Sequence, residues 1–390
     1  MTVRRQMVLL AALSAALLVV MIGLPWAAGT VGKGDFIGYW SASRLLLERR
    51  DPFDADALWA LQYATYPERG YLIYTWNPPW ALVVLLPVAL VPFHVAAKLW
   101  LIANLLVLAG AGGWLWFQVS GERYGRGLII AVIASVLFPP SLAALAAGQI
   151  VPWVLAAAIA GFFNQWQGRR LAYAGAAMVV VALKPHVTFL LLAFSGWHSL
   201  RHRQGRFILG AAATLLGLLV ALTLLYPGWP ASYSNNLLGH SLIQWQTPTL
   251  GGALYSLWPV GWIRYVGLLS MLAVPWLARL WEKKDAPSVL SKLLLLSVAL
   301  APFGWSFDQV LLLPAILQMI FWRRVLARST WLNLGLAALY VVPFAMRLSQ
   351  FDEFSFVWVP WLTIGLYMWT ARSVESARLR EISAVPENAA

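Results

Sequence analysis

The recurrence of long apolar runs constrains the fold of this chain more than any other feature. Such runs return along the whole sequence, and about 20 apolar residues are needed to cross the hydrocarbon core of a bilayer as a helix. Hydrophobic residues make up 61% of the 390 residues and charged residues only 11%, whereas a soluble domain contains about 25% charged residues. We therefore expect an all-α, polytopic membrane protein with a single integral-membrane domain over residues 1–380.

Basic residues occur mainly in short clusters between the apolar runs. A net charge of +13 would suggest nucleic acid as the partner of a soluble protein, but cytoplasmic loops of membrane proteins carry an excess of Lys and Arg. The clusters therefore predict topology, and no nucleic-acid partner is expected. They hold 19 of the 28 basic residues, namely Arg4, Arg5, Arg123, Arg126, Arg169, Arg170, Arg201, Arg203, Arg206, Arg279, Lys283, Lys284, Lys292, Arg323, Arg324, Arg328, Arg372, Arg378 and Arg380. This pattern predicts a cell-membrane protein with both termini in the cytoplasm, and residues 381–390 as a disordered tail.

The apolar runs between these clusters predict 12 transmembrane helices. Residues 7–28 are interpreted as an uncleaved first span rather than a secretory signal, because the apolar region is longer than the usual stretch of about 7–15 residues. The later runs cover residues 95–117, 128–143, 150–163, 171–197, 207–226, 263–281, 290–303, 310–322, 332–344 and 356–369.

Two regions are interpreted as hairpins of short helices. Residues 171–197 are basic at both ends and contain a Lys-Pro-His sequence at 184–186, so this turn is expected to face outward. Residues 128–163 are expected to turn in the same way at the Gly-Gln pair 148–149. Residues 78–92 are short and bounded by prolines, so we expect them to be embedded without crossing.

Two extracytoplasmic loops are predicted, over residues 29–77 and 227–262. The first is acidic and contains the stretch WSASRLLLERR, whose apolar residues at helical spacing predict a helix that lies in the membrane interface. The chain has no Cys, which excludes disulfides, thiolate nucleophiles and thiolate metal sites. The chemistry must therefore come from Asp, Glu, His, Lys or Arg.

Asp35 is the first candidate for a general base. It follows the first span in a segment rich in aromatic residues, with Tyr39 and Trp40 close by in sequence. Desolvation by aromatic rings raises the pKa of a carboxylic acid toward neutrality, which suits general-base catalysis. The alternative is that Asp35 caps the helix that follows it. The sequence leaves both interpretations open.

Ionisable residues near the apolar runs are further candidates, because a charge at membrane depth costs at least about 2.5–3.5 kcal/mol. Lys184, with His186 as its neighbour, could hold an anionic phosphate or could snorkel to the interface. Asp308 could orient an acceptor hydroxyl, pair with Lys184 across a cavity, or cap a helix. Asp51 and Asp54 fit a turn as well as a cation site. Neither a two-His metal spacing nor a Gly-rich phosphate loop is present.

Tryptophan is abundant, with 23 residues in the chain. An aromatic belt at the membrane interface accounts for most of them. A surplus within the acidic first loop would also suit a cavity in which sugar faces stack on indole rings. The Trp content therefore favours a membrane protein, and a sugar-binding site remains an alternative interpretation of part of it.

Several short motifs occur together in a fixed order. They are Asp35-Phe36-x-x-Tyr39-Trp40-x-Ala42-x-Arg44-Leu45, Asp51-Pro52-Phe53-Asp54, Tyr74-x-x-Asn77-Pro78-Pro79-Trp80, Trp100, Gly148-Gln149, Lys184-Pro185-His186 and Trp305-Ser306-Phe307-Asp308. In this order and spacing the chain resembles glycosyltransferase family 87, the polyprenol-phosphate-mannose-dependent α-mannosyltransferase type of the GT-C fold. The resemblance implies a GT-C-like bundle of about 12 transmembrane helices whose outer first loop carries interfacial helices.

The same resemblance implies a hexosyltransferase. Such an enzyme takes a hexose, usually mannose, from a polyprenyl-phosphate carrier in the membrane and transfers it to a lipid-linked or glycan acceptor on the extracytoplasmic side. The resemblance assigns Asp35 as catalytic base and brings Lys184 and His186 near the carrier phosphate. The remaining candidates for substrate binding are Gln149, Tyr39, Trp40 and Asp308. No cofactor and no metal ligand are predicted, although the residues leave a divalent cation open.

Two other classes of protein are compatible with the sequence. A polyprenyl-lipid flippase or transporter would also be polytopic with buried charges, but the paired inverted repeats typical of transporters are not apparent. A catalytically inactive assembly partner in cell-envelope glycan synthesis is the third class, since family resemblance does not guarantee a live site.

Overall fold

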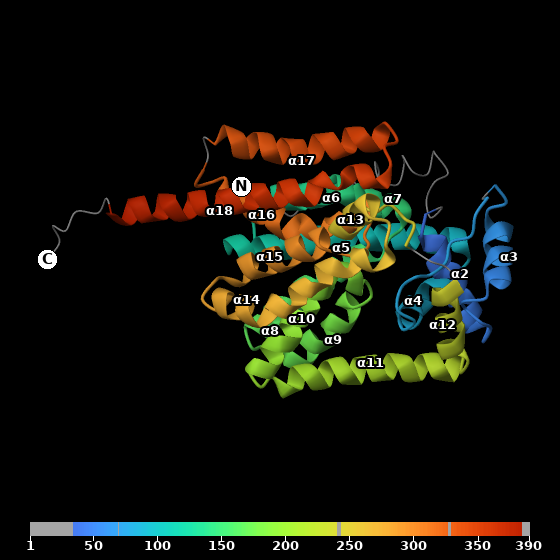
Figure 1. Cartoon of the computed structure of the whole chain (residues 1–390). Helices are drawn as coiled ribbons and strands as arrows, with labels where there is room; N and C mark the ends of the chain where they lie inside the picture. The colour runs from blue at the N-terminus through green and yellow to red at the C-terminus, as the bar shows by residue number, and fades with distance from the viewer. Residues whose placement is uncertain (1–33, 69, 240–242, 327–328, 384–390) are drawn as a thin grey trace.

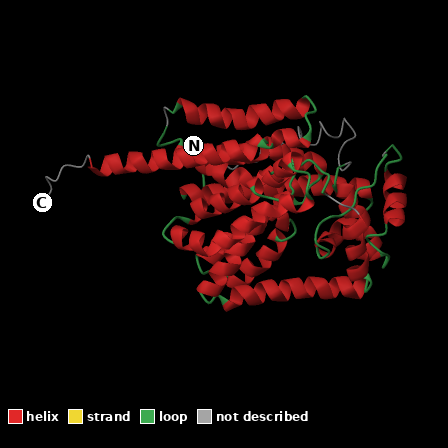
Figure 2. Cartoon of the chain, in the orientation of Figure 1, coloured by secondary structure: helices red, strands yellow, loops and turns green. Residues whose placement is uncertain are grey.

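The computed structural model of the chain describes residues 34–68, 70–239, 243–326 and 329–383. Within these ranges the regular structure is helical and no strand occurs (Figure 2), which confirms the predicted all-α class. The predicted first span at 7–28 and residues 384–390 of the predicted tail lie outside the described residues. The last helix continues to Ser383, so the first three residues of that tail are helical.

Helices of very different length form the bundle in Figure 1. They are α5 (Phe93–Ser120), α6 (Arg126–Leu137), α7 (Pro139–Ala147), α8 (Val151–Trp166), α9 (Leu171–Val181), α10 (Pro185–Arg201), α11 (Gly205–Leu225), η1 (Gly261–Ala273), α14 (Val274–Trp281), α15 (Ala286–Ala299), η2 (Ser306–Leu312), α16 (Leu313–Trp322), α17 (Thr330–Leu348) and α18 (Trp358–Ser383). Shorter helices are α2 (Phe36–Leu47), α3 (Ala55–Thr65), α4 (Ala81–Ala89), α12 (Trp229–Gly239), α13 (Leu250–Leu257) and η3 (Glu353–Phe356). Of these, α2, α3, α4 and α12 gather at one end, on the right of Figure 1.

Five helical segments of the described chain are long and apolar enough to cross a membrane. They are α5, α11, η1 with α14, α17, and η3 with the greater part of α18. The helices α6 and α7 form a sixth candidate that bends by 54° at Pro139. Helices α9, α15 and η2 with α16 are apolar but shorter, and the 11 residues of α9 rise only about 16 Å, roughly half of a bilayer core. The membrane character is therefore supported, whereas the predicted count of 12 spans is not.

The two predicted hairpin turns are present. Helix α9 ends at Val181, and α10 begins at Pro185 directly after Lys184. Proline suits the first helical position because the backbone N–H that it lacks would have no partner there. The second turn separates α7 from α8 at residues 148–150. Both turns end at the same cavity, described below.

The first loop folds into helices that pack on the bundle. Helix α4 has 9 residues and a length of about 13 Å, too short to cross a bilayer, as expected for residues 78–92. Ten of the 12 residues of helix α2, which was expected to lie in the membrane interface, are buried within the protein. The reason is that α3 and α4 cover it, with Arg44 donating a hydrogen bond to the Ala89 carbonyl at 3.3 Å.

The Asp-Pro-Phe-Asp segment forms a turn that starts α3. The Asp51 carboxylate accepts a hydrogen bond from the Phe53 N–H at 2.9 Å. Asp54 caps α3 by accepting from the N–H groups of Asp56 and Ala57. This confirms the turn interpretation of these two aspartates, because each side chain satisfies backbone groups that would otherwise lack partners.

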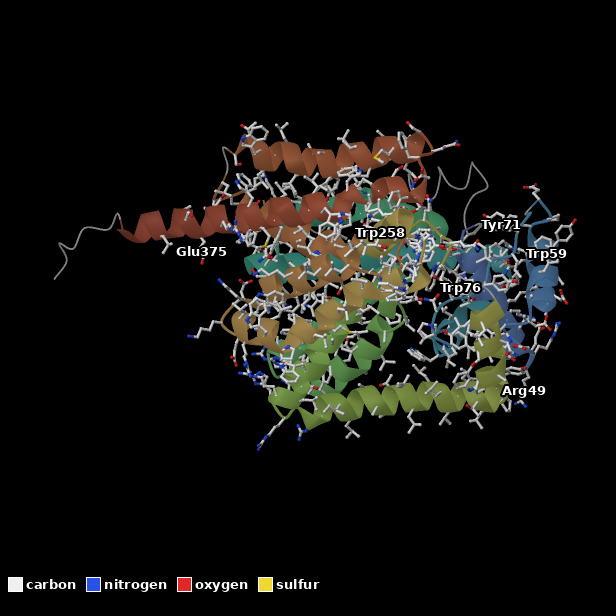
Figure 3. The ribbon with its side chains drawn as sticks, viewed as in Figure 1. Arg49, Trp59, Tyr71, Trp76, Trp258 and Glu375 are labelled. Carbon is white, nitrogen blue, oxygen red and sulfur yellow. The ribbon has the colours of Figure 1, made fainter. Side chains whose placement is uncertain are left out.

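Ion pairs join several of the basic clusters at the end of the bundle opposite α2. The pairs, with their N–O distances, are Arg324–Glu122 at 2.6 Å, Arg201–Glu282 at 3.2 Å and Lys284–Glu375 at 3.8 Å. Each pair links two segments that sequence analysis assigned to the same side of the membrane. Figure 3 labels Glu375 at this end and Trp59, Tyr71 and Trp76 at the other. These three pairs therefore bring together segments that were predicted to share one side of the membrane.

Candidate active site

A cavity of about 860 Å³ lies at the end of the bundle where the first loop packs. The first loop, the α7–α8 turn, the α9–α10 turn and the segments around Trp245 and Trp305 form its wall. Five predicted site residues line it: Asp35, Tyr39, Gln149, Lys184 and His186. The fold therefore brings together side chains separated by up to 151 positions in sequence.

The Asp35 carboxylate points to Gln149 rather than to the helix that follows it. Asp35 occupies the N-cap position of α2, but its side chain makes no hydrogen bond to the first-turn N–H groups. It accepts a hydrogen bond from Gln149 Nε2 instead. Tyr39 Oη donates to Gln149 Oε1 at 3.1 Å. The carboxylate is thus held at the cavity wall by an amide that is itself held by a phenol.

The α7–α8 turn that carries Gln149 depends on a glycine. Gly148 ends α7 with a φ of +67°, and a Cβ at this position would lie 2.5 Å from Phe36 Cβ. Its carbonyl accepts from Trp100 Nε1 at 2.8 Å, and Asn104 Nδ2 donates to the Gln149 carbonyl at 3.2 Å. Only glycine combines this backbone conformation with so close a contact. The turn is therefore fixed against α2 and α5.

Burial raises the pKa of Tyr39 well above its ordinary value, and the negative charge of Asp35 raises it further. The phenol consequently stays protonated throughout the neutral pH range. A protonated Tyr39 can donate to Gln149, so the hydrogen-bond chain to Asp35 is maintained across that range.

Lys184 and Asp308 form a buried ion pair with an Nζ–Oδ1 distance of 2.6 Å and side-chain exposures of 5% and 1%. Asp308 Oδ2 also accepts from the Trp305 N–H at 3.0 Å. Asp308 therefore both pairs with Lys184 and caps η2, which combines two of the alternatives left open by the sequence. Lys184 lines the cavity and does not snorkel, whereas Asp308 lies behind the cavity wall. The Lys184 ammonium also lies 4.7 Å from the centroid of the Phe307 ring.

An aromatic wall faces these charged groups. The Trp305 ring stacks on Phe307 with centroids 5.9 Å apart, and Trp245 meets Trp305 edge-on at 5.6 Å. The His186 ring lies 6.4 Å from Trp305, and its Nε2 is buried without a hydrogen-bond partner among the residues that the structure describes. Aromatic faces flanked by hydrogen-bonding groups suit a ligand with both apolar and hydroxylated surfaces.

Trp40 is a predicted substrate-binding residue that makes its contacts outside this arrangement. Its indole N–H donates to the Val91 carbonyl at 3.0 Å, and its ring packs edge-on against Phe93 at 5.4 Å. It is buried and does not line the cavity. Its contacts are with the segment that leads into α5.

Sequence analysis did not select Asn77, Trp245 or Trp305 as site residues. Asn77 lines the cavity, and its amide donates to the Leu183 carbonyl at 2.8 Å, which joins the first loop to the α9–α10 turn. The Asn-Pro-Pro sequence at 77–79 was the available signal for Asn77. Trp305 belongs to the motif at residues 305–308, whereas Trp245 carried no signal distinct from that of a membrane belt. Among the described residues, no group of three or more His, Cys, Asp or Glu could hold a metal ion.

The fold and the cavity define a helical membrane protein with a carboxylate and a buried ammonium in one aromatic-walled site. Comparison with known families gives the class: the chain belongs to glycosyltransferase family 87, whose sequence profile matches residues 74–314. It is thus a membrane glycosyltransferase by family. No curated protein and no solved structure matches the chain significantly. Asp35 and Tyr39 precede the matched range, so the profile match does not include these two residues.

Proposed function

We propose that this protein transfers a hexose, with mannose as the first candidate, from a polyprenyl-phosphate carrier to a glycolipid or glycan acceptor. The reaction takes place at the extracytoplasmic side, and Asp35 is the general base. One observation carries the proposal: the Asp35 carboxylate and the Lys184 ammonium line the same cavity of about 860 Å³. In the transfer of a sugar from a phosphate, a base takes the proton of the acceptor hydroxyl and a cation stabilises the phosphate that leaves. One cavity with both groups suits this reaction.

The proposed reaction breaks one bond and forms another at the anomeric carbon. The acceptor hydroxyl oxygen attacks this carbon while its proton passes to Asp35. The bond between the carbon and the phosphate oxygen breaks, and the electron pair leaves with the lipid phosphate. Lys184 stabilises the negative charge that develops on that oxygen. His186, whose Nε2 has no partner within the described part of the chain, offers a further hydrogen bond to the phosphate or the sugar.

The aromatic wall supports a sugar as the transferred group. Trp245, Trp305 and Phe307 present ring faces and edges opposite the first loop. The apolar face of a pyranose can pack on such rings while its hydroxyls reach polar groups. This division of surfaces matches a hexose better than a fully apolar substrate.

The test measures sugar transfer in membranes from labelled polyprenyl-phosphate sugars. Asp35→Asn should lower transfer by about 10²–10⁴-fold, the usual contribution of a general base. The matched control is Asp56→Asn, which removes an exposed carboxylate from α3 and should leave transfer unchanged. Full activity of the Asp35 variant would contradict the proposal. Movement of labelled lipid without transfer would point to the flippase. The absence of both movement and transfer would point to an inactive assembly partner.

A further inference from the structure

A second cavity, of about 390 Å³, lies at the last turn of α10. Its lining comes from the end of α8 and the α8–α9 turn, from the end of α10 and the α10–α11 turn, and from α14. Lys184 of the candidate active site directly precedes the first turn of α10, and the 17 residues of this helix put a length of about 25 Å between the two cavities. The second cavity is therefore separate from the candidate active site, and we call it the α10 cavity.

Four arginines flank the α10 cavity. Arg169 and Arg170 directly follow the lining segment of the α8–α9 turn, and Arg203 and Arg206 lie in and directly after the α10–α11 turn. All four are exposed, and none of them forms an ion pair with another residue of the described chain. The two turns therefore provide an excess of positive charge beside the cavity.

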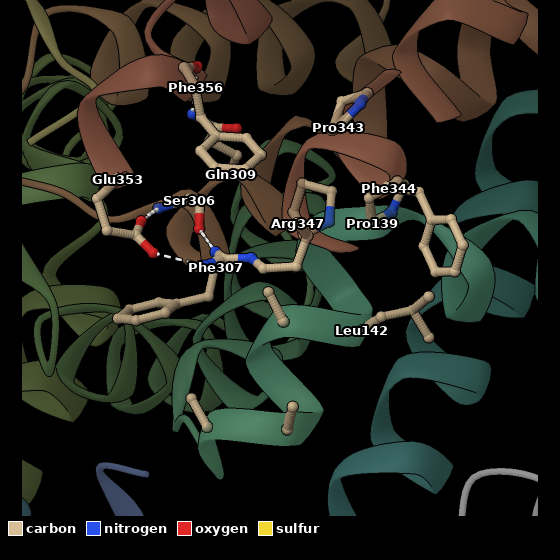
Figure 4. Close-up of a pocket in the computed structure, with 14 residues that line it drawn as sticks. Pro139, Leu142, Ser306, Phe307, Gln309, Pro343, Phe344, Arg347, Glu353 and Phe356 are labelled. Carbon is tan, nitrogen blue, oxygen red and sulfur yellow. Dashed lines mark hydrogen bonds and ion pairs between the residues drawn. The ribbon is translucent and has the colours of Figure 1, made fainter. Parts of the chain in front are cut away.

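This arrangement of charge differs from that of the cavity between α7 and α17, which also measures about 390 Å³. There Arg347 Nη1 lies 2.9 Å from Glu353 Oε1, and Arg347 Nη2 donates to Ser306 Oγ (Figure 4). The α10 cavity has a similar pair in its lining, Arg201 with Glu282 at 3.2 Å, but the four flanking arginines are not part of it. An excess of positive charge therefore remains at the α10 cavity.

The lining of the α10 cavity contains a buried hydrogen-bond acceptor. Gln204 Nε2 donates to the Gln165 carbonyl at 3.2 Å, which fixes the orientation of the amide. Gln204 Oε1 is then buried without a hydrogen-bond partner among the residues that the structure describes. Because buried polar atoms are normally satisfied, this oxygen suits a ligand that brings a hydroxyl or an N–H group. The Trp166 and His198 rings, stacked with centroids 5.5 Å apart, form another part of the lining.

Apolar side chains on the outside of the same helices suit acyl chains. Leu200 on α10 is 65% exposed and Leu280 on α14 is 50% exposed, and each is close in sequence to a lining residue. Helix α11 starts directly after the α10–α11 turn and is a candidate membrane span in which 6% of the most apolar window is buried. The α10 cavity therefore lies where charged and apolar surfaces meet, as they do at the edge of a bilayer.

We propose that the α10 cavity binds the headgroup of an anionic phospholipid that carries a hydroxyl, such as phosphatidylglycerol. The phosphate lies beside the flanking arginines, a headgroup hydroxyl donates to Gln204 Oε1, and the acyl chains contact Leu200 and Leu280. Basic pockets between membrane helices bind anionic headgroups through this chemistry. Membrane orientation alone accounts for basic residues in the turns, but it requires neither a cavity nor a buried acceptor between them. The site needs no sugar transfer, so it goes beyond the proposed function.

Native mass spectrometry of the full-length protein in detergent tests the choice of lipid. The probes are phosphatidylglycerol, phosphatidylmethanol, which has the same charge but no headgroup hydroxyl, and zwitterionic phosphatidylcholine. We expect phosphatidylmethanol to bind about fivefold more weakly than phosphatidylglycerol, because one hydrogen bond is lost. Phosphatidylcholine should bind more weakly still, because it has no net charge. Binding of phosphatidylglycerol no tighter than that of either other lipid would overturn the proposal.

Substitutions test the location of the bound lipid. Arg169→Gln combined with Arg203→Gln removes one arginine from each turn and should weaken phosphatidylglycerol binding by about tenfold. The matched control, Arg323→Gln combined with Arg372→Gln, removes the same charge from exposed positions outside the lining and should leave binding unchanged. Equal weakening by both double variants would overturn the proposal, because net charge alone would then explain the effect. Thermal unfolding without added lipid verifies that both double variants are folded.

A soluble anion separates the lipid from a free phosphate ester. Glycerol 3-phosphate shares the phosphate and hydroxyl chemistry of the lipid headgroup but has no acyl chains, so it should not displace the bound lipid at millimolar concentration. Displacement would show that the site takes a soluble ligand, and it would overturn the lipid as the occupant. These measurements involve no sugar transfer, so the proposed function and this inference can fail separately.

Discussion

The Lys184 ammonium and the Asp308 carboxylate lie 2.6 Å apart although 124 residues separate them in the chain. Both side chains are almost fully buried. Removal of one member of such a pair leaves an uncompensated charge away from water, which costs about 3–5 kcal/mol. The stability of the bundle therefore depends on the presence of both members of this pair.

Separate and combined substitutions of this pair should give different results. Lys184→Met should lower the free energy of unfolding by about 3–5 kcal/mol, and Asp308→Asn should do the same. The double variant should be more stable than either single variant, because it leaves no unpaired charge. It should nevertheless fail to transfer sugar if Lys184 holds the phosphate. Thermal unfolding in detergent and transfer assays on the same preparations check both statements. A double variant as unstable as the sum of the singles would contradict the coupling.

Gly148→Ala should damage the site more than an equivalent change elsewhere. The left-handed backbone conformation costs about 1–2 kcal/mol for alanine, and the close contact with Phe36 adds about 1–3 kcal/mol of overpacking. Gly168→Ala is the control, because Gly168 has a φ of +64° and an added Cβ there would meet no described atom within 4 Å. Only the Gly148 variant should lose transfer activity, since only this turn carries Gln149. Equal losses of activity would show that the contact with Phe36 is unimportant.

Tyr39→Phe should reduce activity and remove one source of alkaline instability. The substitution removes the hydrogen bond to Gln149, worth about 0.5–1.5 kcal/mol. Because the pKa of Tyr39 is raised above 10.0 in the folded protein, the unfolded chain loses this proton first. The stabilisation that protonated Tyr39 gives to the folded state is complete below about pH 10. It is lost as the pH rises through the pKa that Tyr39 has in the folded protein. The stability difference between wild type and Tyr39→Phe should therefore shrink above pH 10 in unfolding measurements. A difference independent of pH would contradict this assignment.

Cysteine labelling can test the grouping of the basic clusters. The chain contains no Cys, so each introduced thiol is unique. Thiols at Glu122 and Arg324, which form an ion pair, should react with an impermeant reagent from the same side of the membrane. A thiol at Trp59 on α3 should react from the opposite side. Reaction of the Glu122 and Trp59 positions from one side would contradict the predicted topology and imply a crossing at residues 78–92.

Short motifs predicted much of the site because each marks a break between helices. Gly148, Pro152 and Pro185 are residues that favour the ends of helices over their interiors. Polar neighbours such as Gln149 and Lys184 therefore lie at helix ends. Gln149, Lys184 and His186 reach the cavity in this way. The local pattern of residues 51–54 likewise predicted its turn, since an aspartate at the N-cap acts on its own neighbours in sequence.

The features that sequence analysis missed depend on distant contacts. Hydrophobic length alone does not tell a helix that crosses a bilayer from a short helix inside the protein, so the described residues leave the predicted count of 12 spans unconfirmed. Trp40 lies next to Tyr39 in sequence, but successive helical residues point about 100° apart. The Trp40 ring therefore packs against Phe93 and does not line the cavity.

The amide of Gln149 gives the hydrogen-bond chain of the site a direction. Tyr39 has one proton to donate, and it donates to the oxygen end of the amide. The nitrogen end must then face Asp35, where it can only donate. An Asp35 oxygen that receives this N–H is an acceptor and does not carry a proton toward Gln149. Tyr39 thereby sets the direction of the whole hydrogen-bond chain, and this direction leaves Asp35 as an acceptor at the cavity wall, as the proposed general-base role requires.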